Sequence, residues 1–395
     1  MDTHKKNRVN FGSVRKLPSG RWQARITVDE GAPRIPGPIT YATSKEAWTY
    51  ISSVQSDQAR GIYHDPRKGE RRLVDFAQEW IDNGGSRGHL AVRTIELYED
   101  LLKRHIAPAI GNKAIGKITA AMVRSWYTAL GKELAERAAQ PLADGGKRLA
   151  TGRVRLRQSY AFLKGVMSTA TADGLIGKNP CQIIGAGMVR SPERPFMSIP
   201  DFVTIMQAMP EDLRPVLALT YGAHLRLGEV PALIWSDLNL KAGTLLVERQ
   251  VVQTRLALII TPTKTEDTRR VDLPDITLTV MSDYLKTVRR GLPSAPLFLR
   301  ADGKPLTRAQ LQHAFKKARN SVGLEQFHLH DVRHSGLTVS AQGGATPREL
   351  MARAGHSTMA AAMKYQHAAD ERGKVVASLM NDAMTAAMQQ GTQQA

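Results

Sequence analysis

The apolar positions divide the chain into three stretches with different periods. Residues 12–26 alternate apolar and polar side chains around a Pro-Ser-Gly turn, which predicts a β-hairpin. A third short strand is expected over 37–42, followed by a helix that begins at Ser44 as its N-cap. The first stretch is therefore predicted to be a three-stranded sheet with one helix.

Apolar residues then recur every three or four positions between residues 73 and 188, as in amphipathic helices. Four long helices and no strands are expected in this stretch. Its large aromatic residues, Trp126, Tyr127 and Phe162, are interpreted as core packing and not as base-stacking groups. The segment GAGMVRSPERPFMSIP ends the helical period with Gly, Ser and three prolines and predicts a domain boundary.

From residue 198 onward the pattern is mixed. Helical periods surround the β-rich segment TLLVERQVVQTRLALIITPTKTEDTRRVDLP, which is expected to hold three short strands. No period of 20 to 50 residues repeats, which argues against a solenoid. The fold class predicted is multi-domain and mostly α with small β elements, ending in a mixed α/β domain.

A chain of 395 residues exceeds what one hydrophobic core supports. The changes of pattern predict an N-terminal domain over 1–60, a helical domain over 73–188 and a C-terminal domain over 198–385. Linkers are expected over 61–72 and 189–197, and a disordered tail over 386–395.

Charge and cysteine content narrow the class of partner and the compartment. Lys and Arg outnumber Asp and Glu by 55 to 36, a net charge of +19 that suits a polyanion. Charge alone leaves RNA, a membrane surface or simple solubility open. The single cysteine, Cys181, excludes an internal disulfide and fits a reducing cytoplasm. No apolar run is long enough for a membrane span, and none follows the basic N-terminus as in a secretory signal.

Five residues in the C-terminal half suit phosphodiester chemistry. Arg226 lies in HLRLGEVPAL, His330 and Arg333 in HLHDVRHSG, and His356 and Tyr365 in AGHSTMAAAMKYQHA. A guanidinium fork matches phosphate oxygens bidentately and keeps its charge. A tyrosine hydroxyl becomes a nucleophile when such a cage stabilises its phenolate. Together they point to a tyrosine that attacks a phosphodiester.

This order of motifs resembles the tyrosine recombinase family, the phage integrases and their relatives. The family elements correspond here to Arg226-Leu-Gly-Glu229, Lys264, His330-Asp-Val-Arg333, Gly355-His356 and Tyr365. The tyrosine follows His356 by nine residues, as the family pattern requires. The likeness covers roughly residues 198–380, with a weaker one toward the N-terminus.

Two positions depart from the family pattern. His224 stands where a glycine usually precedes the Leu-Arg pair, and Ala354 replaces a common leucine before Gly-His. The histidine is expected to change local backbone freedom near Arg226. The second change is milder.

The resemblance implies a role for each motif residue. Arg226 and Arg333 would hold the phosphate oxygens, and Tyr365 would attack. Lys264, on a hairpin, would protonate the leaving oxygen, with Arg269 and Arg270 as substitutes or DNA backbone contacts. His330 would relay protons, with His328 and His334 in packing or supporting roles. His356 would donate to a phosphate oxygen, and Glu229 would orient the site or brace the fold.

The resemblance also implies where the other domains contact DNA. The N-terminal sheet resembles the arm-binding domain of phage integrases, with Arg15, Lys16, Arg21 and Arg25 in a DNA groove. A basic hairpin that only braces the rest of the protein is the competing interpretation. The helical stretch resembles the core-binding domain of the family, and its basic residues, Arg93 and Arg155 among them, are expected to face DNA.

The function expected from the resemblance is that of an integrase of a phage or mobile element. Four protomers would act on two double-stranded attachment sites through a 3′-phosphotyrosyl intermediate and a Holliday junction. No metal or other cofactor is expected, and an excisionase or a DNA-bending host factor would be the accessory partner. The location would be the cytoplasm, on the nucleoid of a bacterial host. The alternatives are a topoisomerase IB-like nicking-closing enzyme and a non-catalytic DNA-binding regulator of the same fold.

Overall fold

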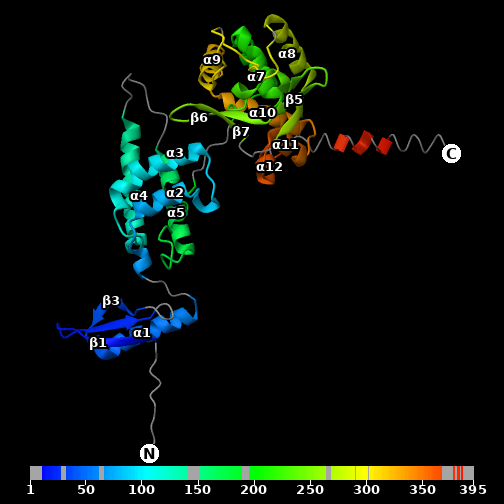
Figure 1. Cartoon of the computed structure of the whole chain (residues 1–395). Helices are drawn as coiled ribbons and strands as arrows, with labels where there is room; N and C mark the ends of the chain where they lie inside the picture. The colour runs from blue at the N-terminus through cyan, green and yellow to red at the C-terminus, as the bar shows by residue number, and fades with distance from the viewer. Residues whose placement is uncertain are drawn as a thin grey trace, which may run out of the picture. The chain divides into compact units, whose positions relative to one another are not determined.

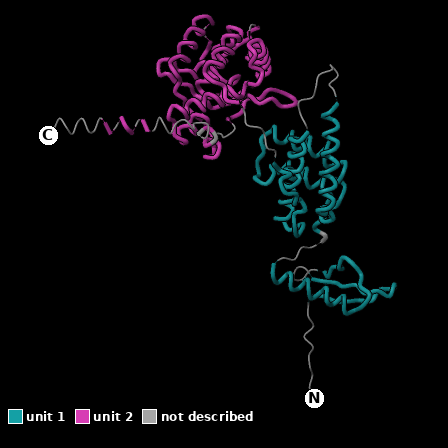
Figure 2. The backbone as a smooth tube through the Cα atoms, turned by 180° about the vertical axis from the view of Figure 1, so that it is seen from behind, with its two compact units in different colours: residues 1–191 teal, residues 192–395 magenta. Residues whose placement is uncertain are grey.

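The computed structural model describes most of the chain in two compact units, residues 1–191 and 192–395 (Figure 2). The residues described are 11–27, 33–61, 66–140, 152–188, 195–263, 268–289, 291–300 and 302–366, with 377–378, 380–382 and 384–385. Lys264 and the predicted tail over 386–395 lie outside these residues. The linker expected over 189–197 is described only from residue 195. The domain boundaries stay predictions.

The first unit begins with the three-stranded sheet and helix that the alternating pattern predicted (Figure 1). The strands pair antiparallel in the order β1-β2-β3, and residues of α1 form one small core with the sheet. The elements are β1 (Gly12–Lys16), β2 (Trp22–Ile26), β3 (Ile35–Tyr41) and α1 (Ser44–Ala59).

The N-cap of α1 is Thr43, so the expectation of Ser44 is wrong by one residue. The Thr43 hydroxyl accepts from the Glu46 backbone N–H at 3.2 Å. The Glu46 carboxylate accepts in return from the Thr43 backbone N–H at 3.3 Å. This reciprocal capping box satisfies two donors at the helix start and selects Thr43 over its neighbour.

The remainder of the first unit is the four-helix arrangement expected from the helical period. The second of these helices continues through a π-type segment, η3, that contains Pro108, which has no N–H to donate. Trp126 and Phe162 are buried in the core, as interpreted from the sequence. The elements are η1 (Pro66–Glu70), α2 (Leu73–Asp82), η2 (Gly85–Arg87), α3 (Val92–Leu101), η3 (Leu102–Gly111), η4 (Ile115–Lys117), α4 (Ala120–Ala139) and α5 (Arg153–Ala172).

The second unit packs α-helices around small sheets (Figure 1). Its helices are α6 (Ile199–Ala208), α7 (Arg214–Gly222), α8 (Asp275–Thr287), α9 (Arg308–Ser321), α10 (Leu329–Gln342), α11 (Pro347–Ala354) and α12 (Met359–Gln366). The short helical turns are η5 (Glu211–Leu213), η6 (Val230–Ala232) and η7 (Trp235–Asp237). The strands are β4 (Leu238–Asn239), β5 (Thr244–Val247), β6 (Arg249–Gln253), β7 (Leu258–Pro262) and β8 (Arg269–Asp272).

The described residues of the β-rich segment form four strands, one more than expected. The run that reads as one strand is split at Glu248: β5 pairs with β8, while β6 pairs with β7 in a separate hairpin. Hydrophobic alternation alone does not show where a strand changes partners, which is why the expected number was too low. The hairpin projects from the unit in Figure 1, and Leu256 at its tip is 97% exposed.

Helix α10 occupies the centre of the second unit. Nine of its fourteen residues are buried, including Val332 and Leu337, so apolar groups surround it on several sides. It packs against α7, α11 and α12. Arg226 follows the end of α7, His356 follows the end of α11, and Tyr365 lies on α12. Within the described ranges no helix is both long and apolar enough to cross a membrane.

Candidate active site

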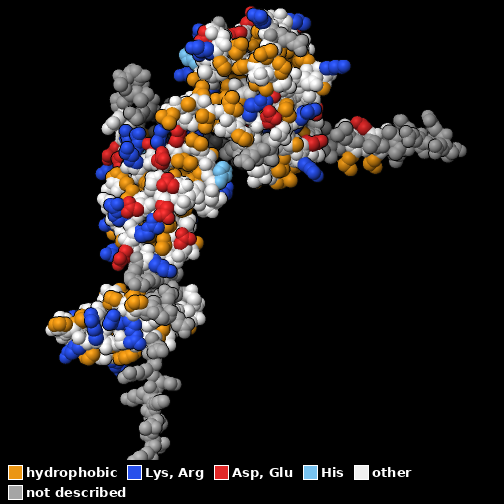
Figure 3. All heavy atoms as spheres, viewed as in Figure 1, with side chains coloured by type: hydrophobic (Ala, Val, Ile, Leu, Met, Phe, Trp, Pro, Cys, Tyr) orange, Lys and Arg blue, Asp and Glu red, His pale blue; other side chains and the backbone are white. Residues whose placement is uncertain are grey.

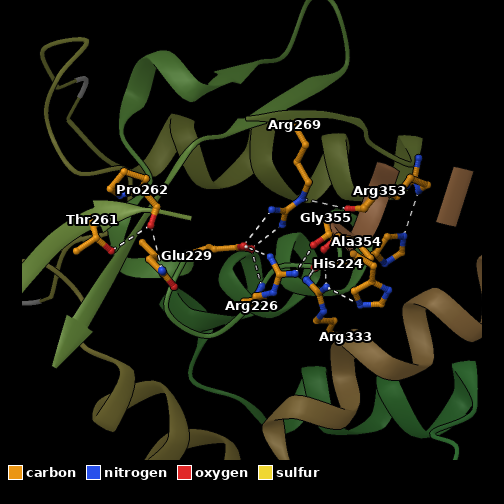
Figure 4. Close-up of polar contacts among 12 residues, drawn as sticks. His224, Arg226, Glu229, Thr261, Pro262, Arg269, Arg333, Arg353, Ala354 and Gly355 are labelled. Atoms are coloured by element: carbon orange, nitrogen blue, oxygen red, sulfur yellow. Dashed lines mark hydrogen bonds and ion pairs between the residues drawn. The ribbon is translucent and has the colours of Figure 1, made fainter. Parts of the chain in front are cut away.

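Arg226 is held by a carboxylate three residues further along the chain. Its backbone N–H donates to Glu229 Oε2 at 2.7 Å and its Nη1 donates to Oε1 at 3.0 Å. Glu229 is 1% exposed and also receives two hydrogen bonds from Arg269, at 2.9 and 2.6 Å (Figure 4). Burial alone would raise the pKa of the Glu229 carboxyl, but its hydrogen bonds with Arg269 and the charge of Arg226 outweigh it and lower that pKa.

Arg269 therefore has a different place from the one expected. It is buried and bidentate on Glu229, so it is neither a DNA backbone contact nor a spare acid. One arginine alone would not offset the cost of burying the Glu229 carboxylate. The guanidinium of Arg269 is the second partner and completes the hydrogen bonding of that carboxylate. Arg270, the next residue, is exposed.

Three consecutive carbonyl groups at the end of α11 accept from three arginines. The Arg353 carbonyl accepts from Arg269 Nε at 3.1 Å, and the Ala354 carbonyl accepts from Arg333 Nη2 at 2.6 Å. The Gly355 carbonyl accepts from Arg226 Nη2. The last carbonyls of a helix have no partner within the helix and carry the negative end of its dipole. This helix end therefore gathers guanidinium groups at one place (Figure 4).

Gly355 is suited to this position by its backbone conformation. It caps α11 with a φ of 61°, in the left-handed region that glycine adopts without penalty. A Cβ there would lie 3.3 Å from Nη1 of both Arg226 and Arg269, tighter than ordinary contact. The glycine thus turns the chain toward His356 and leaves room for two guanidinium groups.

Arg333 reaches the same place from α10. It is 3% exposed, and its Nη1 donates to the His224 carbonyl. Burial, and then the charge of Arg226, lowers the pKa of Arg333 to about 10, so the group still carries its charge at neutral pH. Arg226 and Arg333 place two positive charges close together in a site with few anionic groups. A bound anion would therefore reduce the repulsion between them.

The rings of His356 and Tyr365 stack on each other beside Arg333. Their ring centroids are 5.9 Å apart with planes 10° from parallel, and Tyr365 is 5% exposed. Burial, and then the nearby charge of Arg333, lowers the pKa of His356 to about 4, so its ring is neutral. Its Nε2 lies 3.4 Å from Arg333 Nη2 and would accept from it, which puts the ring proton on Nδ1. That Nδ1 is buried without a protein partner among the described residues.

The Tyr365 hydroxyl is affected by burial and charge in opposite senses. Burial raises the pKa of the phenol, and Arg333 and Arg226 lower it in part. The net direction is upward, so in the free protein the hydroxyl keeps its proton at neutral pH. Helix α12 presents this side chain to the core formed with Leu337 and Leu350.

His330 and Arg333 differ in exposure although they lie three residues apart on α10. His330 is exposed, and its ring contacts His334 at a centroid distance of 4.8 Å. His334 in turn lies 5.5 Å from the ring of Tyr365. The chain of rings from His330 to Tyr365 therefore passes through His334, which the motif alone did not indicate.

Four of the expected site residues, Arg226, Arg333, His356 and Tyr365, lie together, and His330 joins them through His334. Lys264 falls between β7 and β8, outside the described residues. Sequence reasoning missed two members of the network, His224 and Arg353, as contact-making side chains. His224 could be singled out only as a departure from the family pattern, and Arg353 only as a charge beside Ala354 and Gly355.

Arg15 and Arg25 of the N-terminal sheet share the face that α1 does not cover. Ala24 and Ile26 of β2 are buried against α1, so Arg25 between them points to the opposite face. Arg15 of β1 pairs across the strands with Gln23, which shares the face of Arg25. Figure 3 shows Lys and Arg side chains over this part of the molecule.

Neighbouring polar groups order this basic face. Arg15 Nε donates to Gln23 Oε1 at 2.9 Å, and Arg21 Nε donates to Thr40 Oγ1 at 2.8 Å. Lys16 lies over the ring of Trp22 at 5.9 Å instead. In the helical part of the same unit, Arg93 is exposed and Arg155 lies 3.6 Å from Asp100.

Comparison with protein families identifies the class that this fold and site define. The model described as "Phage integrase family" matches residues 196–372. The models "Phage integrase, N-terminal domain" and "Phage integrase, N-terminal SAM-like domain" match residues 10–60 and 72–131.

Comparison with individual proteins and solved structures supports the same family. The phiRv2 prophage integrase of Mycobacterium tuberculosis H37Rv is 31% identical over 96% of this chain and 97% of its own length. The Tn1549 transposon integrase in complex with circular-intermediate DNA has a TM-score of 0.62 at 16% identity, over 74% of this chain and 94% of that one. A lambda integrase tetramer bound to a Holliday junction has a TM-score of 0.51 at 18% identity, over 87% and 95%. The chain belongs to the phage integrase family, and it is a tyrosine recombinase, as the motif order predicted.

Proposed function

We propose that this protein cuts and rejoins double-stranded DNA at specific sites with Tyr365 as its nucleophile. The observation that carries the proposal is the convergence of Arg226 and Arg333 on one helix end, beside the stacked pair of His356 and Tyr365. The guanidinium groups are fixed before substrate arrives, so they need no reorganisation when charge develops on a phosphate.

The Tyr365 oxygen attacks phosphorus, and its proton leaves by way of His334 and His330. The bond from phosphorus to the 5′ oxygen breaks, and that oxygen takes a proton from Lys264. The products are a 3′-phosphotyrosyl ester and a free 5′ hydroxyl. Attack of another 5′ hydroxyl on that ester releases Tyr365 and rejoins the DNA without ATP or metal.

Two features of the site support the individual roles. The Nδ1 proton of His356 is buried without a protein acceptor among the described residues, and a phosphate oxygen would supply one. The side chain of Arg226 is 20% exposed, so it can reach substrate while Glu229 holds its other side. The charges of Arg333 and Arg226 would favour the Tyr365 phenolate, and both would also offset the negative charge that develops on the phosphate oxygens in the transition state.

The whole reaction would use four protomers on two attachment sites, with strands exchanged in pairs through a Holliday junction. The lambda integrase tetramer on such a junction supports this assembly by its similar fold. The basic face of the N-terminal sheet would bind arm-type DNA, and Arg93 and Arg155 would lie against core DNA. An excisionase or DNA-bending host factor would set the direction, and the protein would act on the bacterial nucleoid.

The test is Tyr365→Phe on a nicked duplex that traps the covalent intermediate. We expect no covalent adduct from this variant, with DNA binding close to that of the unchanged protein. The matched control is Tyr284→Phe, whose hydroxyl contacts the Leu297 carbonyl at 3.4 Å in the same unit. It should form adduct at the normal rate, and this rate, like that of the unchanged protein, should not change when EDTA is added. An adduct from Tyr365→Phe would show that another residue is the nucleophile.

A further inference from the structure

The end of α11 that gathers the arginines is itself held by the side chain of Arg353. Its Nη2 donates to the Gly222 carbonyl at 3.2 Å and to the Asp272 carbonyl at 3.1 Å. Its Nε donates to His224 Nε2 at 3.2 Å. One guanidinium thus joins α11 to the end of α7 and to β8. The backbone carbonyl of Arg353 accepts from Arg269 (Figure 4).

His224 contacts two arginines with two different groups. Its carbonyl accepts from Arg333, and its ring accepts from Arg353. The ring is 2% exposed, and burial, followed by the charges of Arg353 and Arg333, lowers its pKa to about 3. It is therefore neutral at cellular pH, and Nε2 can offer a lone pair to a guanidinium. The hydroxyl of Ser340, on α10, lies 3.2 Å from the same nitrogen.

The backbone at His224 is in a conformation that a side chain makes unfavourable. Its φ is +52°, and it is the one non-glycine residue with positive φ in the described part of the chain. Left-handed backbone is strained for an L-residue, and glycine would avoid that strain. The ring also needs Gly336 opposite, where a Cβ would lie 2.8 Å from its Nδ1. A strained, buried histidine suggests that the ring does something a glycine cannot.

We propose that His224 and Arg353 form a positioning pair, in which the ring of one anchors the guanidinium of the other and so fixes the helix end that aims Arg226 and Arg333. The inference rests on the proposed function, because the aim of these arginines matters only if they hold a phosphate. Neither residue touches the phosphate. Their effect passes through the Ala354 and Gly355 carbonyls, and through the His224 carbonyl.

The experiment measures the single-turnover rate of covalent adduct formation by the full-length protein on the nicked duplex. Arg353→Met keeps the stem and removes the donors, and His224→Gly permits the same backbone and removes the ring. Each should slow adduct formation by about 10- to 100-fold, because a displacement of about 1 Å at a reacting group can cost that much. DNA affinity should stay close to that of the unchanged protein.

Two further measurements separate a pair from two unrelated structural defects. The double variant should be no slower than the slower single variant, because the effects of two residues that act through one interaction are not additive. Free imidazole should restore part of the rate to His224→Gly, whose vacated space fits it, and should not restore the double variant. Arg348→Met, at an exposed position on the same helix, is the matched control and should keep the normal rate.

Each of the remaining outcomes contradicts either the positioning pair or the proposed function. Normal rates in Arg353→Met, additive effects in the double variant, or equal slowing in Arg348→Met would refute the positioning pair. Should His224→Gly fail to fold, Arg353→Met tests the pair, and His224→Asn, whose amide oxygen can still accept at positive φ, should slow adduct formation less than Arg353→Met does. Equal slowing in these two variants would refute the pair. An absence of Tyr365-dependent adduct in the unchanged protein would instead refute the proposed function.

Discussion

Arginine is used in two opposite ways in the two units of this molecule. In the second unit Arg226, Arg269 and Arg333 are wholly or largely buried, and each donates to at least one carbonyl at fixed distance. On the N-terminal sheet Arg15 and Arg21 are exposed and donate to neighbouring polar groups. The difference in burial predicts that geometry matters at the buried site, and that charge alone matters for the DNA binding proposed for the sheet.

The physical reason is the surrounding dielectric. Buried guanidinium groups cannot rely on water, so every donor needs a protein partner, and these partners set the direction of each fork. Exposed guanidinium groups are solvated and can follow a flexible polyanion at little cost. Replacing arginine by lysine, which keeps the charge and removes the fork, separates the two cases.

The largest expected effect is that of Arg226→Lys. An ammonium cannot donate to both Glu229 and the Gly355 carbonyl with the geometry of a fork, so one hydrogen bond is broken although the charge remains. We expect adduct formation to slow by about 10²- to 10³-fold, the range for removal of one preorganised donor. The measurement is the single-turnover rate on the nicked duplex, with Arg308→Lys, at an exposed position on α9, as control.

A rate for Arg226→Lys equal to that of the unchanged protein would mean that charge alone suffices at the buried site. The contrast between the units would then be wrong. A reduced amount of folded protein, seen by circular dichroism, would instead assign Arg226 to the stability of the unit.

A smaller effect is expected on the N-terminal sheet. Changing Arg15, Arg21 and Arg25 to Lys should leave arm-type DNA binding nearly intact, whereas changing all three to Gln should weaken it. For each phosphate that is no longer neutralised, the slope of log K against log salt should fall in magnitude by about 0.9. The control exchanges Lys45 of α1 and Arg60, the residue that caps this helix, for Gln and should leave the slope unchanged.

These slopes are measured by DNA-binding titrations of the full chain over a range of salt concentrations. Equal slopes for the triple Gln variant and the unchanged protein would favour the hairpin as a structural brace. Much weaker binding by the triple Lys variant would show that this sheet, too, depends on the geometry of the fork.

Much of the fold could be read from the sequence because the periods are clear. The hairpin turn, the four helices and the order of motif residues follow from local patterns and spacing. The partners of the buried polar groups could not be read in this way. Arg269 looks like one more basic residue beside Arg270, and only the fold shows that it lies against Glu229, forty positions away.

The same limit applies to His224. Its departure from the family pattern could be seen in the sequence, together with an effect on backbone freedom, and the left-handed φ accounts for the glycine usually found there. Its interaction with Arg353 joins residues 129 positions apart. Spacing along the chain carries no information on such a pair, because loops and packing decide which side chains meet.

The smallest expected effect concerns acidity and tests how completely the second unit is buried around His224. The folded pKa of this ring is about 3, and an unfolded histidine titrates near 6.5. Between these values the unfolded chain binds the proton and the folded chain does not, so stability falls as pH falls. The contribution is complete above about pH 6.5 and declines by up to about 1.4 kcal/mol per pH unit below it.

His224→Asn should therefore show a smaller drop in melting temperature between pH 7 and pH 4.5 than the unchanged protein does. His313→Asn, at an exposed position on α9, provides the comparison. If the melting temperatures of both variants drop as much as that of the unchanged protein, the ring of His224 is open to water and the contrast between buried and exposed charge is weaker than the structure indicates.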